Sequence, residues 1–146
     1  MIESILKAAK FAVAKGYAEA AATSVTDATI IDLQSGRSVC FIAALGPNTA
    51  SGAVTTLKAK VGDKSDLSDG ELLTVTATHT ADSATSDDDK LLILDVVQPG
   101  KRYVQPVLDR ATAASELCTL IAVTYNARCL PTSQGDTVLD AQLSVN

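Results

Sequence analysis

The spacing of apolar and polar residues changes once along the chain, near residue 23. Before that point, apolar residues recur at intervals of three and four, and lysines fall off their face. This spacing predicts a short amphipathic helix, weakened at Gly16, within a terminal segment of residues 1–22. The apolar positions are Ile2, Ile5, Leu6, Ala9 and Val13.

Three interpretations of residues 1–22 are open. The segment is a helix that caps one end of the core, an arm that docks on a neighbouring subunit, or a helix that lies on a membrane surface. Three lysines stand beside two glutamates, which makes a weak basic face and disfavours the membrane interpretation. The Ala-rich piece at residues 17–22 suits either a helix or an extended arm.

After residue 23 the period shortens to two, which is the repeat of a β-strand. The predicted strands span residues 24–33, 38–45, 54–61, 72–80, 91–97, 102–109 and 117–126. Residues 38–45 are nearly continuous in apolar character, so we expect a central strand that is covered on both faces. A weaker alternation over 137–145 is compatible with a strand or with disorder.

The connections between these strands carry turn-forming residues and no crossover helix. Gln98-Pro99-Gly100 is a turn signal, since proline presets φ and glycine tolerates positive φ. The sequence therefore predicts an all-β fold, an antiparallel β-sandwich or jelly roll of about 7–8 strands with a short N-terminal helix or arm. We expect one β-sandwich domain at residues 23–132, preceded by the 1–22 segment and followed by a tail at 133–146.

Composition narrows the classes of function. The 146 residues include two Phe, three Tyr and no Trp, and the formal net charge is −5. Few aromatics disfavour the stacking of bases or sugars, and the negative charge disfavours polyanions, so we expect no nucleic-acid partner. No apolar run reaches the roughly 18 residues of a membrane span, and we expect no membrane partner and no secretory signal. The cysteines lack metal-binding spacing, so we expect reduced, structural thiols at Cys40, Cys118 and Cys129.

The sequence offers few candidates for catalysis or metal binding. His79 is the only histidine, and we expect it at the surface or at a strand edge. Ser-His-Asp catalysis would need the fold to bring a serine and an aspartate to it. The acidic stretches at residues 63–69 and 87–89 lack the spacing of an EF-hand calcium loop. We therefore expect neither enzymatic activity nor a cofactor or bound metal.

One polar cluster has no obvious structural role. It consists of Lys101, Arg102 and Tyr103, with Arg110 and Arg128 nearby in a hairpin layout of the last two strands. Two interpretations are open. The cluster is an exposed strand start with the tyrosine over the sandwich edge, or it is a protein contact, where Arg and Tyr are enriched as anchors. An acidic chain with a local Arg/Tyr patch favours docking on another acidic protein over DNA.

Four stretches of the chain resemble a known family. They read DATIIDLQSGRSVCFIAAL at 27–45, DVVQPGKRYVQPVLDRATA at 95–113, LIAVTYNAR at 120–128 and LPT at 130–132. Over roughly residues 24 to 132, this pattern is similar to small tailed-phage virion proteins encoded near the major capsid protein, which are capsid cement or decoration proteins. The recurrent residues of that pattern are Lys101, Arg102, Tyr103, Tyr125 and Arg128.

The resemblance implies a small β-sandwich or jelly-roll subunit that sits on an icosahedral shell as a dimer or trimer and cements neighbouring capsid subunits. The implied partners are the major capsid protein and further copies of this chain. The implied location is the capsid surface of the virion, after assembly in the cytoplasm of the bacterial host. We expect the protein interface at Ile2, Ile5, Leu6, Phe11, Lys101, Arg102, Tyr103 and Arg128. The alternative is a receptor- or carbohydrate-binding β-module of a phage fibre or tail, which the scarcity of aromatics disfavours.

Overall fold

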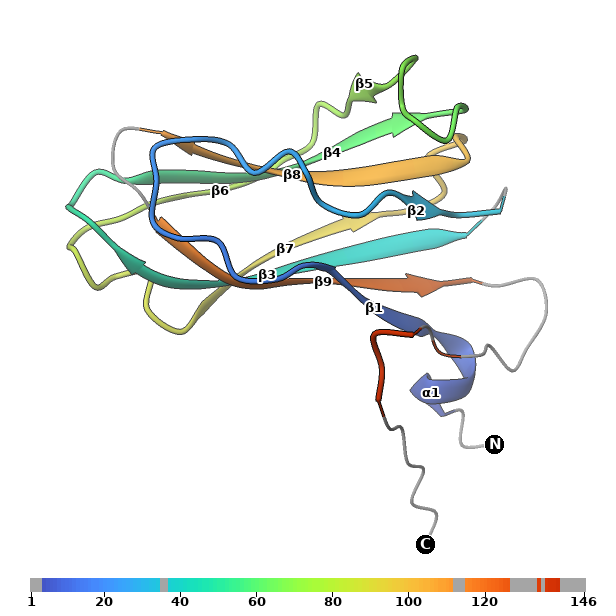
Figure 1. The fold of residues 1–146 in the computed structure, drawn as a ribbon, viewed down its shortest axis with the longest axis horizontal. Helices are drawn as coiled ribbons and strands as arrows, with labels where there is room; N and C mark the ends of the chain where they lie inside the picture. The colour runs from blue at the N-terminus through green and yellow to red at the C-terminus, as the bar shows by residue number, and fades with distance from the viewer. Residues whose placement is uncertain (1–3, 35–36, 112–114, 127–133, 135, 140–146) are drawn as a thin grey trace, which may run out of the picture.

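The computed structural model describes residues 4–34, 37–111, 115–126, 134 and 136–139. Within these residues, nine strands form two antiparallel sheets packed face to face, which confirms the predicted all-β sandwich (Figure 1). One short helix, α1 (Ile5–Ala8), precedes the first strand. None of the described helical residues belongs to a segment with the length and hydropathy that crossing a membrane requires.

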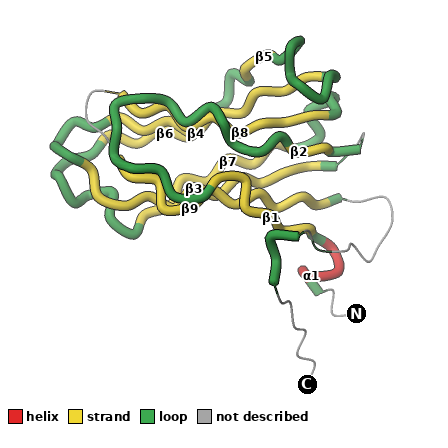
Figure 2. The backbone as a smooth tube through the Cα atoms, in the orientation of Figure 1, coloured by secondary structure: helices red, strands yellow, loops and turns green. Residues whose placement is uncertain are grey.

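The chain passes repeatedly between the two sheets. Sheet A contains, in order, β1 (Lys10–Lys15), β9 (Ser115–Tyr125), β3 (Ser38–Asn48) and β7 (Lys90–Val96). Sheet B contains, in order, β2 (Ile31–Asp32), β8 (Tyr103–Ala111), β4 (Val54–Gly62) and β5 (Glu71–Leu72), and β6 (Ala77–Thr80) also pairs with β4. Early strands therefore pair with late ones, β1 with β9 and β2 with β8. Figure 2 shows the long connection between β1 and β2 crossing from one sheet to the other.

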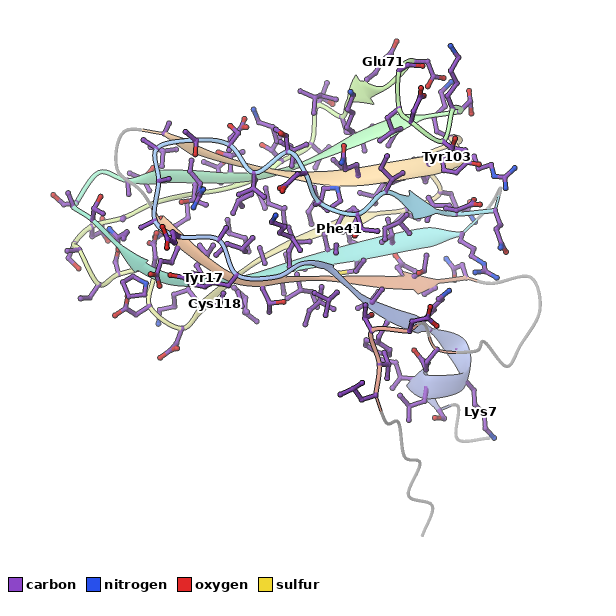
Figure 3. All side chains as sticks on the ribbon, viewed as in Figure 1. Lys7, Tyr17, Phe41, Glu71, Tyr103 and Cys118 are labelled. Atoms are coloured by element: carbon purple, nitrogen blue, oxygen red, sulfur yellow. The ribbon has the colours of Figure 1, made fainter. Side chains whose placement is uncertain are left out.

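Alternating side chains build one core between the sheets. Along β3, every second residue from Val39 to Leu45 is buried, and these residues form one cluster with Leu57 and Leu108 of sheet B. Phe41 is fully buried and lies between the two layers (Figure 3). Burial of such a side chain contributes roughly 2–3 kcal/mol.

The N-terminal segment contains a short helix, but the helical pattern predicted as far as Val13 is wrong from Lys10 onward. Among the described residues of this segment, Ile5–Ala8 alone are helical, and Lys10–Lys15 form β1, which pairs with β9 at the edge of sheet A. A four-residue helix has little stability of its own. Phe11 and Val13 alternate with alanines and so also fit the repeat of a strand. Backbone pairing with β9 stabilises the strand conformation over Lys10–Lys15.

Two other predicted strands are shorter in the structure. Of residues 24–33, only Ile31–Asp32 form a strand, β2. In the segment before β2, Gln105 Nε2 donates hydrogen bonds to the carbonyl oxygens of Thr26 and Ala28, at 3.1 and 2.7 Å. These side-chain hydrogen bonds take the place of backbone hydrogen bonds between strands. Residues 72–80 divide into β5 and β6. The 140–145 part of the predicted tail alternation lies outside the described residues.

Candidate functional site

The outward side chains of sheet A form a largely apolar surface, which we call the sheet A outer face. They are Phe11 and Val13 of β1, Glu116, Cys118, Thr119, Ile121, Val123 and Tyr125 of β9, Cys40, Ile42 and Ala44 of β3, and Leu91, Ile93 and Asp95 of β7. The residues that alternate with them point mostly into the core. β3 is therefore central in its sheet but covered on one side only by the sandwich, which corrects the expectation that both of its faces are covered.

One row of the sheet A outer face is β-branched across all four strands. Val13 pairs with Ile121, Ile121 with Ile42, and Ile42 with Ile93. Ile93 keeps 54% of its surface exposed, and Leu91 in the neighbouring row keeps 57%. Antiparallel sheets that face water normally carry polar residues on that side. The composition of this face is instead that of a contact surface.

The sheet A outer face carries two carboxylates, those of Asp95 and Glu116, and each accepts a hydrogen bond from a tyrosine hydroxyl. The Tyr17 hydroxyl donates to Glu116 Oε1 at 2.8 Å. Asp95 Oδ1 accepts a hydrogen bond from the Tyr125 hydroxyl at 2.6 Å. Burial, together with this hydrogen bond, raises the pKa of Tyr125 to about 12. Burial also raises the pKa of the Cys40 thiol, which keeps it neutral and unreactive. The middle row of the face, from Val13 to Ile93, carries no charged side chain.

The outward side chains of sheet B, the sheet B outer face, are mostly polar. They are Val54, Thr56, Lys58 and Lys60 of β4, Gln105, Val107 and Asp109 of β8, Thr78 of β6 and Leu72 of β5. Lys58 forms an ion pair with Asp109, and its hydrogen bond lowers the pKa of that carboxyl group. Thr78 Oγ1 donates to Thr56 Oγ1 at 3.1 Å. These polar groups satisfy one another within the sheet.

A hollow of about 550 Å³ lies on the sheet B outer face, between Ser24 and Leu72. Its carboxylate, Asp109, accepts a hydrogen bond from Ser24 Oγ at 2.7 Å besides its ion pair. Its amide, Gln105, is held by backbone carbonyls. Ser24, Gln105 and Asp109, which line this hollow, therefore already have partners within the chain.

A terminal unit projects from the sandwich on the outer side of sheet A (Figure 1). It combines α1 with residues 134 and 136–139, and Gln134 joins the two. Gln134 Nε2 donates to the carbonyl oxygens of Leu6 and Ala9, and Gln134 Oε1 accepts from the Phe11 amide at 2.9 Å. Thr137 Oγ1 accepts from the Val13 amide at 3.0 Å. Both amides face the free edge of β1, so these side chains cap that edge.

The predicted interface residues divide between two distant places. Ile5 and Leu6 lie on α1, with Ile5 62% exposed, and Phe11 lies on the sheet A outer face. Lys101, Arg102 and Tyr103 lie instead at the start of β8 in sheet B. Ile2 and Arg128 fall outside the described residues, as does Cys129. The interface at these positions stays a prediction.

The charges of the basic cluster are engaged by the chain itself. Lys101 Nζ lies 2.6 Å from Asp63 Oδ2. Arg102 donates to both carboxylate oxygens of Asp32, at 3.0 and 2.9 Å, and its guanidinium lies 5.1 Å from the Tyr103 ring centre. The hydrogen bonds from Arg102 lower the pKa of Asp32. This cluster fastens β2 and the 62–70 loop to β8.

Arg110 does not belong with that cluster, which corrects its expected placement. It sits at the opposite end of β8, about 25 Å along the strand at ~3.3 Å per residue. Its guanidinium is buried and donates to the carbonyl oxygens of Glu19, Thr23 and Ser115, at 2.6, 3.0 and 2.9 Å. Burial lowers the pKa of this arginine. It serves to hold the long β1–β2 connection against the sandwich.

His79, Asp87 and Ser115 meet in a polar cluster that is mostly buried. The fully buried Asp87 accepts a hydrogen bond from Ser115 Oγ at 2.6 Å. His79 Nε2 lies 3.0 Å from Asp87 Oδ1, although the two atoms are not aligned for a hydrogen bond. In a catalytic triad the imidazole stands between hydroxyl and carboxylate. Here the carboxylate stands between the other two, so the hydroxyl proton points to Asp87 and not to a general base.

This cluster has a clear structural task. Ser115 Oγ also lies 2.8 Å from Thr55 Oγ1, so the loop before β7 is tied to both β4 and β9. His79 lies on β6, at an edge of sheet B, where the sequence places it. Sequence reasoning missed Asp87, because an aspartate in an Asp-Asp-Asp run gives no signal that one member is buried.

The acidic stretches have local structural uses. Asp69 accepts hydrogen bonds from the backbone amides of Asp63 and Lys64, and the first of these lowers its pKa. Asp66 Oδ1 likewise accepts a hydrogen bond from the backbone amide of Ser68, at 3.0 Å. Across the described part of the chain, no three His, Cys, Asp or Glu side chains gather in a way that could hold a metal ion.

Comparison of the chain with protein-family models and with curated proteins gave no match.

Proposed function

We propose that this chain is a structural protein of a phage virion, which binds the outer surface of the capsid and cements neighbouring major capsid protein subunits. The observation that carries the proposal is the contrast between the two outer faces of the sandwich. Sheet B presents paired lysine, threonine and aspartate side chains to water. Sheet A presents isoleucine, leucine and valine. A surface of the second kind is suited to bind another protein.

The strand order supports a jelly roll in particular. Eight-stranded jelly rolls nest two Greek keys, so that the first strand neighbours the last and the second neighbours the one before the last. The pairs β1–β9, β2–β8, β3–β7 and β4 with β5 and β6 follow that order. Jelly rolls occur in viral capsid proteins and in lectins, and fold alone does not separate the two.

The placement of the aromatic residues favours the structural role over the carbohydrate-binding alternative. All five aromatic side chains are described, and each lies on a different element. They are Phe11, Tyr17, Phe41, Tyr103 and Tyr125. Phe41 is buried in the core, Tyr103 is stacked by Arg102, and Tyr125 is bonded to Asp95. No platform for stacking a sugar ring is formed by residues so dispersed.

The terminal unit suits a role in gripping a shell. It stands beyond sheet A and exposes Ile5 and the whole side chain of Leu139. A shell offers many equivalent sites, so weak single contacts add up to firm attachment when copies are linked. Contacts that bridge two capsid subunits raise the free energy needed to separate them.

The test is cryo-electron microscopy of particles grown with and without the gene for this chain. The proposal expects density for the sandwich on the outer surface at contacts between capsid subunits, and particles without it should break at lower temperature. A second experiment uses a chain that lacks residues 1–8 and retains β1. A deletion through residue 16 would remove β1, an edge strand of sheet A, and would confound binding with folding.

Absence of the chain from purified particles, at saturating amounts of added protein, would overturn the proposal. Full attachment of the chain lacking residues 1–8 would exclude the terminal helix from the contact and direct attention to the sandwich faces.

A further inference from the structure

The two edges of sheet A differ in how their backbone groups are used. At the β1 edge, the amides of Phe11 and Val13 donate to side chains of the terminal unit. At the other edge, β7 pairs with β3 alone among the described residues. We infer that the free edge of β7 is a binding site for an extended segment of another protein, which joins sheet A as an additional strand. The inference goes beyond the proposed function and does not depend on a capsid.

The open backbone groups of β7 follow from the pairing across the whole sheet. In an antiparallel sheet, successive residues of a strand direct their N–H and C=O groups to opposite sides. The amides of Phe11 and Val13 face the free edge of β1. Ala12 between them therefore faces β9, where it pairs with Ala122. Ile121, the neighbour of Ala122 in β9, then faces β3.

The same alternation continues through β3 to β7. Ile42 pairs with Ile121 and so faces β9. The neighbouring Phe41 faces β7, where it pairs with Leu94. The residues of β7 that alternate with Leu94 therefore direct their N–H and C=O groups to the free edge, and they are Leu91, Ile93 and Asp95. Within the described part of the chain, these backbone groups have no hydrogen-bond partner.

An open edge of this kind is usually protected in a soluble protein. The common devices are proline, a bulge, or a covering segment. β7 has seven residues, no proline and no register shift against β3. The opposite edge of the same sheet does have a cover, which is made by Gln134 and Thr137. The chain thus closes one edge of sheet A and leaves the other available for pairing.

Two hollows lie one after the other along β7. The first, of about 320 Å³, is bounded by Leu91 and Leu92 of β7 and by Thr78 of β6. The second, of about 230 Å³, is bounded by Leu94 of β7 and by Val75 on the facing side. A strand added to β7 would lie over both hollows and direct every second side chain toward them. Their aliphatic walls favour apolar side chains at those positions.

The charge beside the first hollow favours a basic partner. The loop between β6 and β7 carries Asp82, Asp88 and Asp89, and none of these forms an ion pair among the described residues. Lys90 offsets only one of the three charges. A lysine or arginine at the nearby end of an incoming segment is therefore attracted to this loop.

The direction of the incoming strand follows from the rest of the sandwich. The strand pairs of both sheets are antiparallel. A strand that continues this pattern runs opposite to β7 and brings its carboxyl end to the acidic loop. A helix would not serve, because its own backbone groups are already bonded to one another. The partner is thus an extended segment with alternating apolar residues and basic residues at its carboxyl end, a recognised mode of peptide binding.

The test uses a synthetic peptide that alternates valine and threonine over seven positions, the length of β7, and ends in two lysines at its carboxyl end. Amide hydrogen exchange of the full chain is followed by NMR. In the free chain, the amides of Leu91, Ile93 and Asp95 should exchange rapidly. That of Leu94 should exchange slowly, because Leu94 bonds to β3. The peptide should slow exchange at the three edge amides and leave Leu94 unchanged.

Ile93→Pro and Ile93→Thr form a matched pair of variants. Both remove the outward isoleucine, but proline also removes the N–H that points to the free edge. Ile93→Pro should weaken peptide binding at least about tenfold, because it deletes a hydrogen bond and obstructs the approaching strand. Ile93→Thr should change binding little. The pairing with β3 does not use the Ile93 amide, so both variants should fold, which thermal melting checks.

Modified peptides test the same contact on the unaltered chain. Residues directly opposite each other in an antiparallel pair point to the same face, so the threonines lie opposite the outward residues of β7 and direct their amides to it. Methylation of the threonine amides should therefore abolish binding, and methylation of the valine amides should not. Glutamates in place of the two lysines should weaken binding, and high salt should reduce that difference.

Absence of binding at millimolar peptide overturns the inference. Binding that survives both Ile93→Pro and methylation of the threonine amides overturns it as well, as does slowed exchange that bypasses the three edge amides. Self-association of the chain that Ile93→Pro abolishes would assign the edge to a second copy and also overturn it. None of these measurements involves capsid particles, so the proposed function stands or fails by its own test.

Discussion

The two outer faces of this sandwich are built on the same backbone pattern and end with opposite chemistry. In β4, the buried Leu57 and Ala59 alternate with Thr56, Lys58 and Lys60. In β3, the buried Phe41 and Ala43 alternate with residues that are also apolar. Alternation thus determines which side chains form the core. The identity of the other half of the residues determines whether the remaining face binds water or another chain.

The largest expected effect comes from removing the core that both faces share. Phe41→Ala should lower the free energy of unfolding by about 3–5 kcal/mol, because it removes a fully buried ring and leaves a cavity between the sheets. Urea denaturation of the variant and the wild type measures the difference. Ile42→Ala, on the outward side of the same strand, should cost clearly less. Equal losses would mean that the sheet A outer face is packed as tightly as the core.

A second prediction concerns the polar ties of sheet B. Gln105→Ala leaves the carbonyl groups of Thr26 and Ala28 without their side-chain donor and should cost about 1–2 kcal/mol. Hydrogen exchange should report faster opening of the residues around 24–30. Lys60→Gln, at the position opposite Gln105 in the ladder, serves as the control and should change stability little. An unchanged exchange rate in Gln105→Ala would show that the ladder of β2 alone holds this segment.

A third prediction places an alkaline transition on sheet A. The pKa of Tyr125 is raised to about 12 in the folded chain, from about 10 when unfolded. A raised pKa contributes stability that is fully present below pH ~10 and is lost as the pH rises through the folded value. After allowance for solvent screening, the loss should be of the order of 1 kcal/mol. Tyrosine absorbance titration and melting across this range measure it, and in Tyr125→Phe this part of the pH dependence should disappear.

The smallest expected effect is an acid transition on sheet B. The pKa of Asp109 is lowered, chiefly by its hydrogen bond with Lys58. A lowered pKa contributes stability that is present above the unfolded value of about 3.9 and is lost as the pH falls through the folded value. For a partly exposed pair the contribution should stay below about 1 kcal/mol. Melting of Asp109→Asn should show a weaker loss between neutral and acid pH than the wild type, and high salt should reduce the difference.

Several errors of sequence reasoning share one physical origin, which is competition between local and distant partners. Residues 5–13 fit both a helical and a strand pattern, and the ladder with β9, more than a hundred positions away in the chain, selects the strand from Lys10. Arg110 carries a charge that suggests a surface position, yet three backbone carbonyls gathered by the fold make its burial favourable. The roles of Gln105 and Gln134 have no local signal, since a glutamine binds whatever carbonyl the fold presents to it.

The sequence alone determined the all-β class, most of the strands after residue 23 and the alternation that divides β3 and β4 into inward and outward residues, because the two-residue repeat is a property of the local backbone. The tertiary structure decided which strands are neighbours and so which outward residues share a face. Val13, Ile121, Ile42 and Ile93 are far apart in the chain and become one apolar row only because β1, β9, β3 and β7 lie side by side. Pairing of that kind depends on contacts between distant segments, which local periodicity does not encode.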